Sequence, residues 1–127
     1  MTAPAPAPAP FTPAPIKAPV PLATLKQLDI RVGTIAAVMD VPYSPKLVEL
    51  TVDFGDRRRQ VLAGLKRERA QPGELVGRQA LFVVNLEPRP MAGRISEAML
   101  FDLGYDDGIL PALAVPERPV PNGARAG

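Results

Sequence analysis

The chain of 127 residues carries a formal net charge of +2 and is 46% hydrophobic, which fits one small domain with a modest core. It contains neither cysteine nor histidine, so disulfides, thiolate zinc sites and every catalytic arrangement built on Cys or His are excluded. No apolar run approaches the roughly 20 residues needed to span a bilayer, so no membrane partner is expected.

Residues 1–22 are dominated by proline and alanine, with proline at positions 4, 6, 8, 10, 13, 15, 19 and 21. Proline at this density blocks helix formation and removes backbone donors. We expect a disordered, polyproline-II-biased tail, with the folded domain at residues 23–127; a ligand for proline-recognising domains is the alternative. The segment lacks the basic start and apolar run of a signal peptide, so a cytoplasmic location is expected.

The first half of the domain predicts one helical turn and three strands. Thr24 is placed to cap a turn over residues 25–28, and residues 29–38 form a strand. Gly33 inside that strand suggests a bulge or sharp bend. Residues 47–54 alternate apolar and polar side chains as a second strand, and residues 59–63 form the third after a turn at 55–56.

The second half predicts short helical turns at residues 65–70 and 72–75, followed by a strand at 79–84 that is buried on both sides. Two more strands are expected at 97–103 and 109–115, and the chain then ends in extended and turn conformations. This pattern supports a small β-barrel or sandwich. The element order fits the OB-fold, an all-β, five-stranded, partly open barrel with short helices.

Charge is distributed unevenly along the domain. Residues 57–94 contain nine Lys or Arg residues against three acids, whereas residues 95–127 contain five acids against two Arg. A segment of this kind produces a basic surface that attracts phosphate.

Seven short motifs resemble, in order and spacing, the tRNA-binding domain family, which includes CsaA-type proteins and the C-terminal appendix of many methionyl-tRNA synthetases. They lie at residues 29–35, 53–55, 75–78, 83–86, 88–93, 96–100 and 116–123. The motifs at 53–55, 92–93 and 119–123 favour the CsaA-type branch. The resemblance implies an OB-fold, tRNA binding and a homodimer, with an aminoacyl-tRNA synthetase or unfolded peptides as further partners.

The resemblance, together with the basic run at the hairpin end that supplies Arg58, indicates the tRNA-binding residues Lys46, Arg58, Asn85, Arg89, Arg94, Ser96, Glu97 and Met99. Arg89 follows a proline in a loop, where a guanidinium pairs with phosphate or stacks on a base. For the other motif residues two roles stay open. Asn85 reads a base edge or bonds backbone, and Ser96 contacts a nucleotide or closes a turn.

Glu97 accepts from a base amino group or makes a structural bond, and Met99 offers a platform to a base or fills the core. Arg58 lies on the opposite side of its strand from Arg57 and Arg59. It therefore either contacts phosphate or is solvated in the hairpin turn.

The resemblance places the dimer contact in the N-terminal turn and the C-terminal extended segment, which are apolar and rich in proline. The residues expected there are Leu25, Leu28, Leu113, Pro116, Pro119, Val120 and Pro121.

Two functions follow from the sequence: structure-selective tRNA binding by a dimer and, as the alternative, CsaA-like chaperone or export activity on unfolded peptide. Catalysis is not expected. Without His or Cys it would need paired carboxylates, and the adjacent Asp106 and Asp107 point apart in an extended chain. No metal or cofactor is expected.

Overall fold

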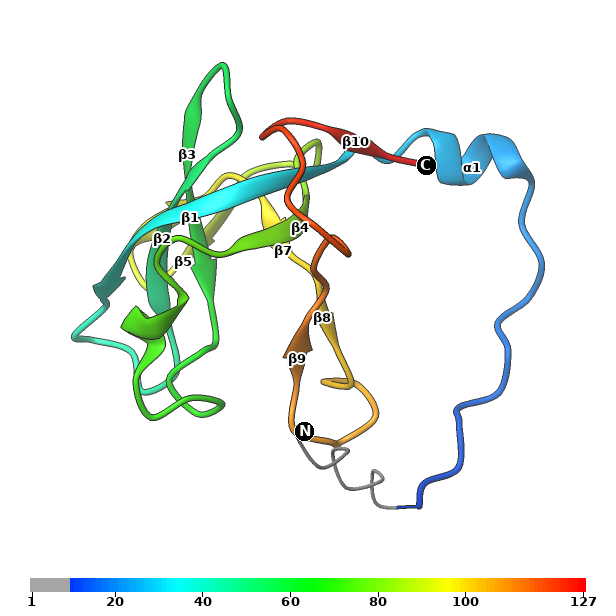
Figure 1. Cartoon of the computed structure of the whole chain (residues 1–127). Helices are drawn as coiled ribbons and strands as arrows, with labels where there is room; N and C mark the ends of the chain where they lie inside the picture. The colour runs from blue at the N-terminus through cyan, green and yellow to red at the C-terminus, as the bar shows by residue number, and fades with distance from the viewer. Residues whose placement is uncertain (1–9) are drawn as a thin grey trace, which may run out of the picture.

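The structure is a computed structural model that describes residues 10–127. Residues 1–9, and with them part of the predicted tail, lie outside the described residues. Residues 10–21 contain no helix or strand and all are exposed. They run as an extended arm that leads into the first helix (Figure 1). No helix within residues 10–127 has the length and apolar character needed to cross a membrane.

Five antiparallel strands form the barrel: β1 (Ile30–Asp40), β2 (Val48–Asp53), β3 (Arg58–Ala63), β4 (Gln79–Val83) and β7 (Met99–Leu100). Their order in the sheet is β3-β2-β1-β4-β7. Around them lie helix α1 (Leu22–Lys26), the 3-10 helix η1 (Pro72–Leu75), and the hairpins β5 (Arg89–Met91)–β6 (Arg94–Ser96) and β8 (Asp102–Leu103)–β9 (Ala112–Leu113). Strand β10 (Arg125–Ala126) pairs with the start of β1. The predicted OB-type architecture is confirmed.

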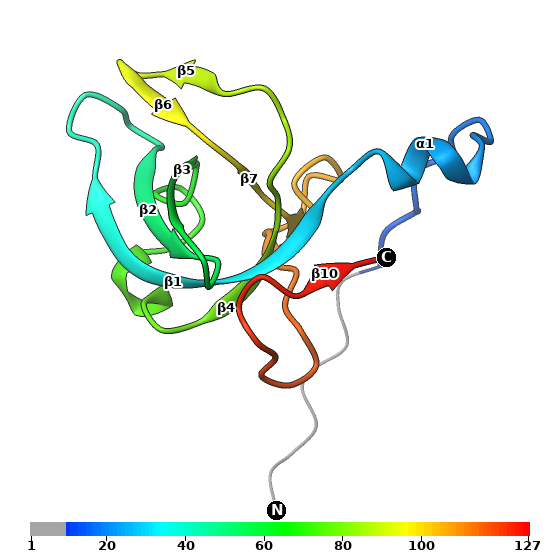
Figure 2. The ribbon, with the colours of Figure 1, turned by 90° about the horizontal axis from the view of Figure 1, so that it is seen from above.

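The barrel is nearly closed between β3 and the segment leading into β7. The backbone N–H of Glu97 donates to the carbonyl of Gln60 at 2.9 Å, and the Glu97 carboxylate accepts from the Gln60 N–H at 3.0 Å. Viewed from above, β1 curves around the barrel and α1 projects away from it (Figure 2). The small barrel thus forms because the long strand β1 bends enough to pair with β4 along its first half and with β2 along its second half.

Strand β1 bends at a bulge, although not at the residue that the sequence suggested. Its pairing with β2 shifts register between Ile35 and Ala37, so the extra residue is Ala36 and not Gly33. Gly33 serves close packing instead, since a Cβ there would lie 2.5 Å from Cγ1 of Val52 and 2.8 Å from the Phe54 ring. The missing side chain lets β1 approach β2 inside the barrel.

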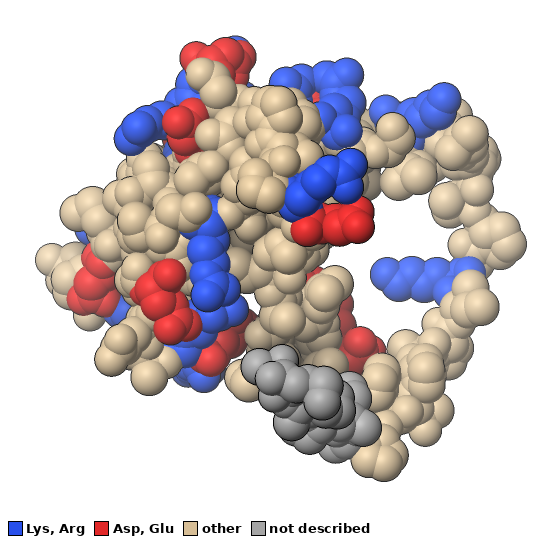
Figure 3. Space-filling view, in the orientation of Figure 1, with Lys and Arg blue, Asp and Glu red and all other residues tan. Residues whose placement is uncertain are grey.

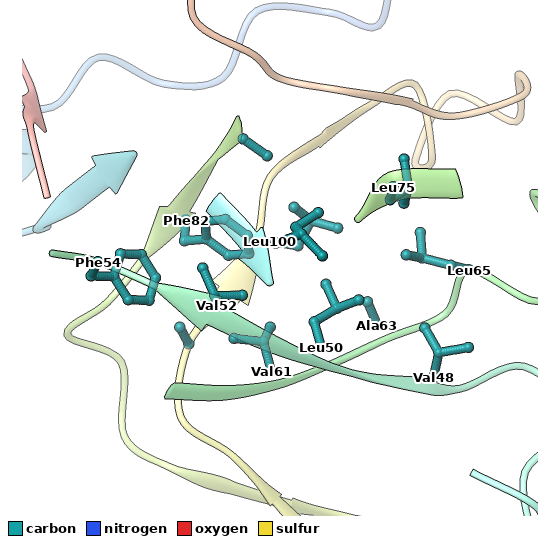
Figure 4. Close-up of a cluster of buried hydrophobic side chains, with 13 residues drawn as sticks. Val48, Leu50, Val52, Phe54, Val61, Ala63, Leu65, Leu75, Phe82 and Leu100 are labelled. Carbon is teal, nitrogen blue, oxygen red and sulfur yellow. The ribbon is translucent and has the colours of Figure 1, made fainter. Parts of the chain in front are cut away.

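The core follows the predicted alternation of β2, whose Val48, Leu50 and Val52 point inward with Phe54 beyond the strand. Figure 4 shows them meeting Phe82 of β4 and residues of β3 and β7. The rings of Phe54 and Phe82 pack edge to face, with centroids 5.4 Å apart. Strand β4 is less enclosed than predicted, because Leu81 is only half-buried.

Several predicted element boundaries are wrong. Residues 65–70 form a turn, in which the N–H groups of Glu68 and Arg69 both donate to the Leu65 carbonyl; the helix cannot continue because Pro72 follows. Helix α1 begins at Leu22 after Pro21, so Thr24 lies inside it and does not cap it.

The predicted strand at 97–103 is split into β7 and β8, and the one at 109–115 is reduced to β9. The hairpin β5–β6 and strand β10 lie where the sequence predicted loop and extended chain.

Candidate nucleic-acid interface

Two loops of the barrel carry most of the predicted tRNA-binding residues. OB-folds bind oligonucleotides through the face of their second and third strands and through the loops that join barrel strands 1–2 and 4–5. Here those loops are residues 41–47 and 84–98. Lys46 lies on the first, Arg58 on β3 and Met99 on β7. The second loop carries Asn85, Arg89, Arg94, Ser96 and Glu97.

Three of these cations are exposed and, within residues 10–127, form no ion pair or side-chain hydrogen bond: Lys46, Arg58 and Arg89. Arg94 differs, because its Nη1 lies 3.3 Å from the carboxylate of the half-buried Glu49. On the side drawn in Figure 3, basic side chains mostly lie beside acidic ones. The cations without a carboxylate partner are therefore the ones available for phosphate.

Ser96 and Glu97 have their polar atoms engaged within the barrel. The Ser96 hydroxyl is buried; its oxygen accepts from the Leu62 N–H at 3.1 Å, and it donates to the Ala98 carbonyl at 2.9 Å. Glu97 bonds Gln60 through both its backbone and its side chain. The structure thus places both residues at the closure between β3 and β7.

Asn85 is also engaged by the protein. Its Oδ1 accepts from the Asp29 N–H and its Nδ2 donates to the Gln27 carbonyl, both at 2.7 Å. The side chain therefore ties the end of β4 to the link between α1 and β1. Met99 is half-buried and pairs with Val83 across β7 and β4.

A hollow of about 210 Å³ is lined by Asn85 and by seven residues that were not among the predicted tRNA-binding residues. It is bounded by the start of β1, the β2–β3 turn and the end of β4. Its lining residues are Asp29, Arg31, Phe54, Asp56, Arg57, Arg59, Val84 and Asn85. Arg57 and Arg59 line it and Arg58 does not, in agreement with the predicted alternation. The pairing of Asp29 with Arg31, two residues apart on one strand face, was the available signal.

Two of the three guanidinium groups that line the hollow, those of Arg31 and Arg59, are held in place by hydrogen bonds. Hydrogen bonds from Arg31 at 3.0 Å hold the pKa of Asp29 below its usual range; burial opposes this effect, and Arg125 adds to it at 3.1 Å. The same pairing raises the pKa of Arg31. Nη1 of Arg59 donates to the carbonyls of Val84 and Glu97, at 3.0 and 3.3 Å.

A second, apolar hollow of about 340 Å³ lies where α1 meets the end of the chain. Two of the predicted dimer residues, Leu25 and Leu28, line it together with Leu22 and Ile30. None of the α1 residues is buried, and Leu22, Leu25 and Leu28 are 65%, 52% and 42% exposed.

The C-terminal residues predicted for the dimer lie outside this hollow. Leu113 packs against the core of its own barrel. Val120 exchanges two hydrogen bonds with the Gln79 side chain, at 2.7 and 3.1 Å. Pro116 is half-buried, and Pro119 and Pro121 are exposed.

Comparison with known proteins identifies the family of this chain and agrees with its fold. A family model described as a putative tRNA binding domain matches residues 30–125. The methionine–tRNA ligase of Thermococcus kodakarensis is 43% identical over 99 residues, which are 78% of this chain and 13% of that protein. The enzyme of Methanocaldococcus jannaschii is 35% identical over 96 residues, 76% of this chain and 15% of that protein. The chain therefore spans a small part of the length of these relatives.

Two solved structures match over their whole length and over 87% of this chain, each at 29% identity. One is a MetRS related protein from Pyrococcus horikoshii with a TM-score of 0.79, and the other is the chaperone CsaA of Bacillus anthracis with a TM-score of 0.75. The resemblance drawn from the seven motifs is thus confirmed, and the chain belongs to the putative tRNA binding domain family.

Proposed function

We propose that this protein binds tRNA without catalysing a reaction, and that it does so as a homodimer. The observation that carries the proposal is the set of exposed cations Lys46, Arg58 and Arg89, located on the strand and loops with which OB-folds bind oligonucleotides. Membership of the tRNA binding domain family supports the same ligand.

The proposed recognition is of RNA shape and not of sequence. Base edges are read by free hydrogen-bonding groups, whereas phosphate contacts carry no sequence information. The polar side chains of Asn85, Ser96 and Glu97 are engaged within the protein. The free cations remain as the main contacts, and they favour a bent or single-stranded feature of tRNA.

The test is a mobility-shift titration of the full chain with bulk tRNA at several salt concentrations. With about three phosphate contacts from each chain of a dimer, the logarithm of the affinity should fall against the logarithm of salt with a slope of about −4 to −5. Arg89→Ala removes one contact from each chain, so it should weaken binding and reduce the steepness of that slope by about 1.4 to 1.8.

The matched control is Arg67→Ala, which removes the same charge from an exposed turn outside loops 41–47 and 84–98. It should change the slope by less than Arg89→Ala does. Equal effects of the two variants, or no binding at low salt, would contradict the proposal.

The homodimer is proposed because two leucines of α1, Leu22 and Leu25, and Leu28 just after it are exposed beside an apolar hollow. A helix of five residues is not stable without packing partners, and its own barrel buries none of its residues. A second copy that brings its own α1 and chain end to the same place would cover both apolar surfaces. Light scattering at micromolar concentration should give twice the chain mass of 13.5 kDa.

A second candidate function, binding of unfolded peptide, is favoured by the hairpin β8–β9 and its connecting loop. Leu103, Tyr105, Ile109 and Leu110 are 57%, 65%, 45% and 76% exposed there. Apolar surface of this kind binds apolar segments. The test is whether the chain suppresses aggregation of a denatured protein. Suppression that does not change with salt and that is lost in the Leu110→Ser variant would support this function.

A synthetase is proposed as a partner because the curated relatives carry a homologous segment within methionine–tRNA ligases. The test is co-purification of the methionyl enzyme with this chain, in the presence and absence of ribonuclease. A direct contact survives ribonuclease, whereas a contact made through tRNA is lost.

A further inference from the structure

The polar hollow beside Asn85 has the features of a nucleotide subsite. We propose that it binds one unpaired nucleotide through its phosphate group, with the sugar or base against the apolar part of its wall. For its biological ligand this inference rests on the proposed binding of tRNA. The site itself is defined by residues at the start of β1, in the β2–β3 turn, on β3 and just after β4.

The hollow presents guanidinium donors that are already oriented. Hydrogen bonds of Arg59 to two carbonyls use its Nη1, and those of Arg31 to Asp29 use its Nε and Nη2. Because each guanidinium has five donors, both retain N–H groups for a ligand. A side chain that is ordered before binding loses less conformational entropy when the ligand arrives.

The charges of the hollow favour an anion. Three guanidiniums, from Arg31, Arg57 and Arg59, stand against the carboxylates of Asp29 and Asp56. The Asp29 carboxylate pairs with two guanidiniums, because Arg125 also contacts it from outside the hollow. Asp56 and Arg57 are exposed and 3.6 Å apart, so an arriving phosphate replaces only a weak pair.

The volume of the hollow and the residues that line it restrict the kind of ligand further. The volume of about 210 Å³ is below the roughly 300–1,000 Å³ typical of sites for drug-sized ligands, so the hollow encloses only part of one nucleotide, its phosphate with the adjoining sugar or base, and excludes a double helix. Val84 and Phe54 supply the apolar surface. The hollow adjoins loop 84–98, so a strand lying on Arg89 can insert a nucleotide that has left its stack.

The test is an NMR titration of the full isotope-labelled chain with AMP, adenosine and inorganic phosphate at low salt, together with mobility shifts on bulk tRNA. AMP should shift the amide signals of residues 54–57 and 84–85. Adenosine should shift them little, because it lacks the phosphate.

Arg57→Gln is the informative variant, because Arg57 is exposed and, within residues 10–127, its guanidinium pairs only with Asp56, at 3.6 Å. It should weaken AMP binding about tenfold, as expected for the loss of a charged hydrogen bond. Arg58→Gln is the matched control: it removes the same charge from the neighbouring residue, which lies outside the hollow. It should leave AMP affinity within about twofold while still weakening tRNA binding through the salt-dependent contacts.

Three results would overturn the nucleotide site while leaving tRNA binding intact: tRNA binds but AMP does not shift these amides, the two variants weaken AMP equally, or inorganic phosphate binds as tightly as AMP. If AMP binds at the hollow and tRNA does not bind at all, the nucleotide site stands and the proposed function fails.

Discussion

At the scale of single residues, polar side chains of one loop, residues 84–98, have different roles in the fold. Ser96, Glu97 and Asn85 each bond backbone groups that are distant in the chain, while Arg89 from the same loop is exposed. Buried polar groups without partners are costly, so these hydrogen bonds keep the barrel closed and α1 attached. For each of these three residues the sequence left a nucleotide contact or a structural hydrogen bond open, and the geometry supports the structural hydrogen bond.

Ser96→Ala should lower the free energy of unfolding by about 1–3 kcal/mol, because the Leu62 N–H and the Ala98 carbonyl lose their buried partner. Urea denaturation measures this effect. Affinity for tRNA, measured below the unfolding transition, should remain within about twofold. A stable variant with weakened tRNA binding would instead assign the hydroxyl to RNA.

Asp29 makes part of the stability depend on pH. Arg31 lowers the pKa of this carboxyl in the folded state, so the ionised form favours folding. The stabilisation is complete well above the unfolded pKa of about 3.9 and is lost as pH falls through the lower folded value.

Asp29→Asn should therefore be less stable than the wild type at pH 7, and the difference should shrink below about pH 4. Thermal unfolding at a series of pH values measures it. A difference that stays constant from pH 7 to pH 3 would show that the charge of Asp29 is not responsible.

At the scale of elements, the barrel depends on how closely β1 and β2 approach each other. Gly33 faces Val52 and Phe54 without a side chain, and the bulge at Ala36 lets β1 turn from β4 toward β2. Bulges increase local twist, as a five-stranded barrel requires. The glycine and the bulge thus have separate roles in one strand.

Gly33→Ala should destabilise the fold by about 1–3 kcal/mol, because the new methyl group overlaps two packed core side chains. Gly73→Ala is the matched control, since a Cβ at that position meets nothing within 4 Å. Chemical denaturation compares the two variants. Similar stabilities would contradict the close-packing role of Gly33.

For the whole molecule, the apolar surface at α1 and the exposed cations serve two separate parts of the proposed function, dimer formation and tRNA binding. In the proposed function the cations contact phosphate, whereas the exposed Leu22, Leu25 and Leu28 are covered by a second copy. In a dimer, each copy would present one such set of cations to the same tRNA, which raises affinity without a new contact.

Leu25→Glu should convert the dimer into a monomer, because it places a charge in the apolar hollow that Leu25 lines. Gln27→Glu adds the same charge to the neighbouring turn, outside the residues that line the hollow, and should leave the mass unchanged. Light scattering of both variants is the measurement. A wild-type mass of one chain would refute the dimer directly.

The sequence by itself determined the fold class, the family and most of the barrel strands. Alternation in residues 47–54 predicts β2 with its buried face, because one face of a strand must pack on the core while the other stays polar. Arg57 and Arg59 were separated from Arg58 by the same rule. Such features depend on neighbours along the chain, and these are visible in the sequence.

Only the tertiary structure decided which polar residues are free and which are engaged. The donor to the Ser96 hydroxyl, the Leu62 N–H, lies 34 residues away, and the partners of Asn85 lie 56 and 58 residues away. The hollow likewise joins residues of β1, the β2–β3 turn and β4. Hydrogen bonds and pockets form between segments that the fold brings together, and local patterns carry no information about which distant groups will meet.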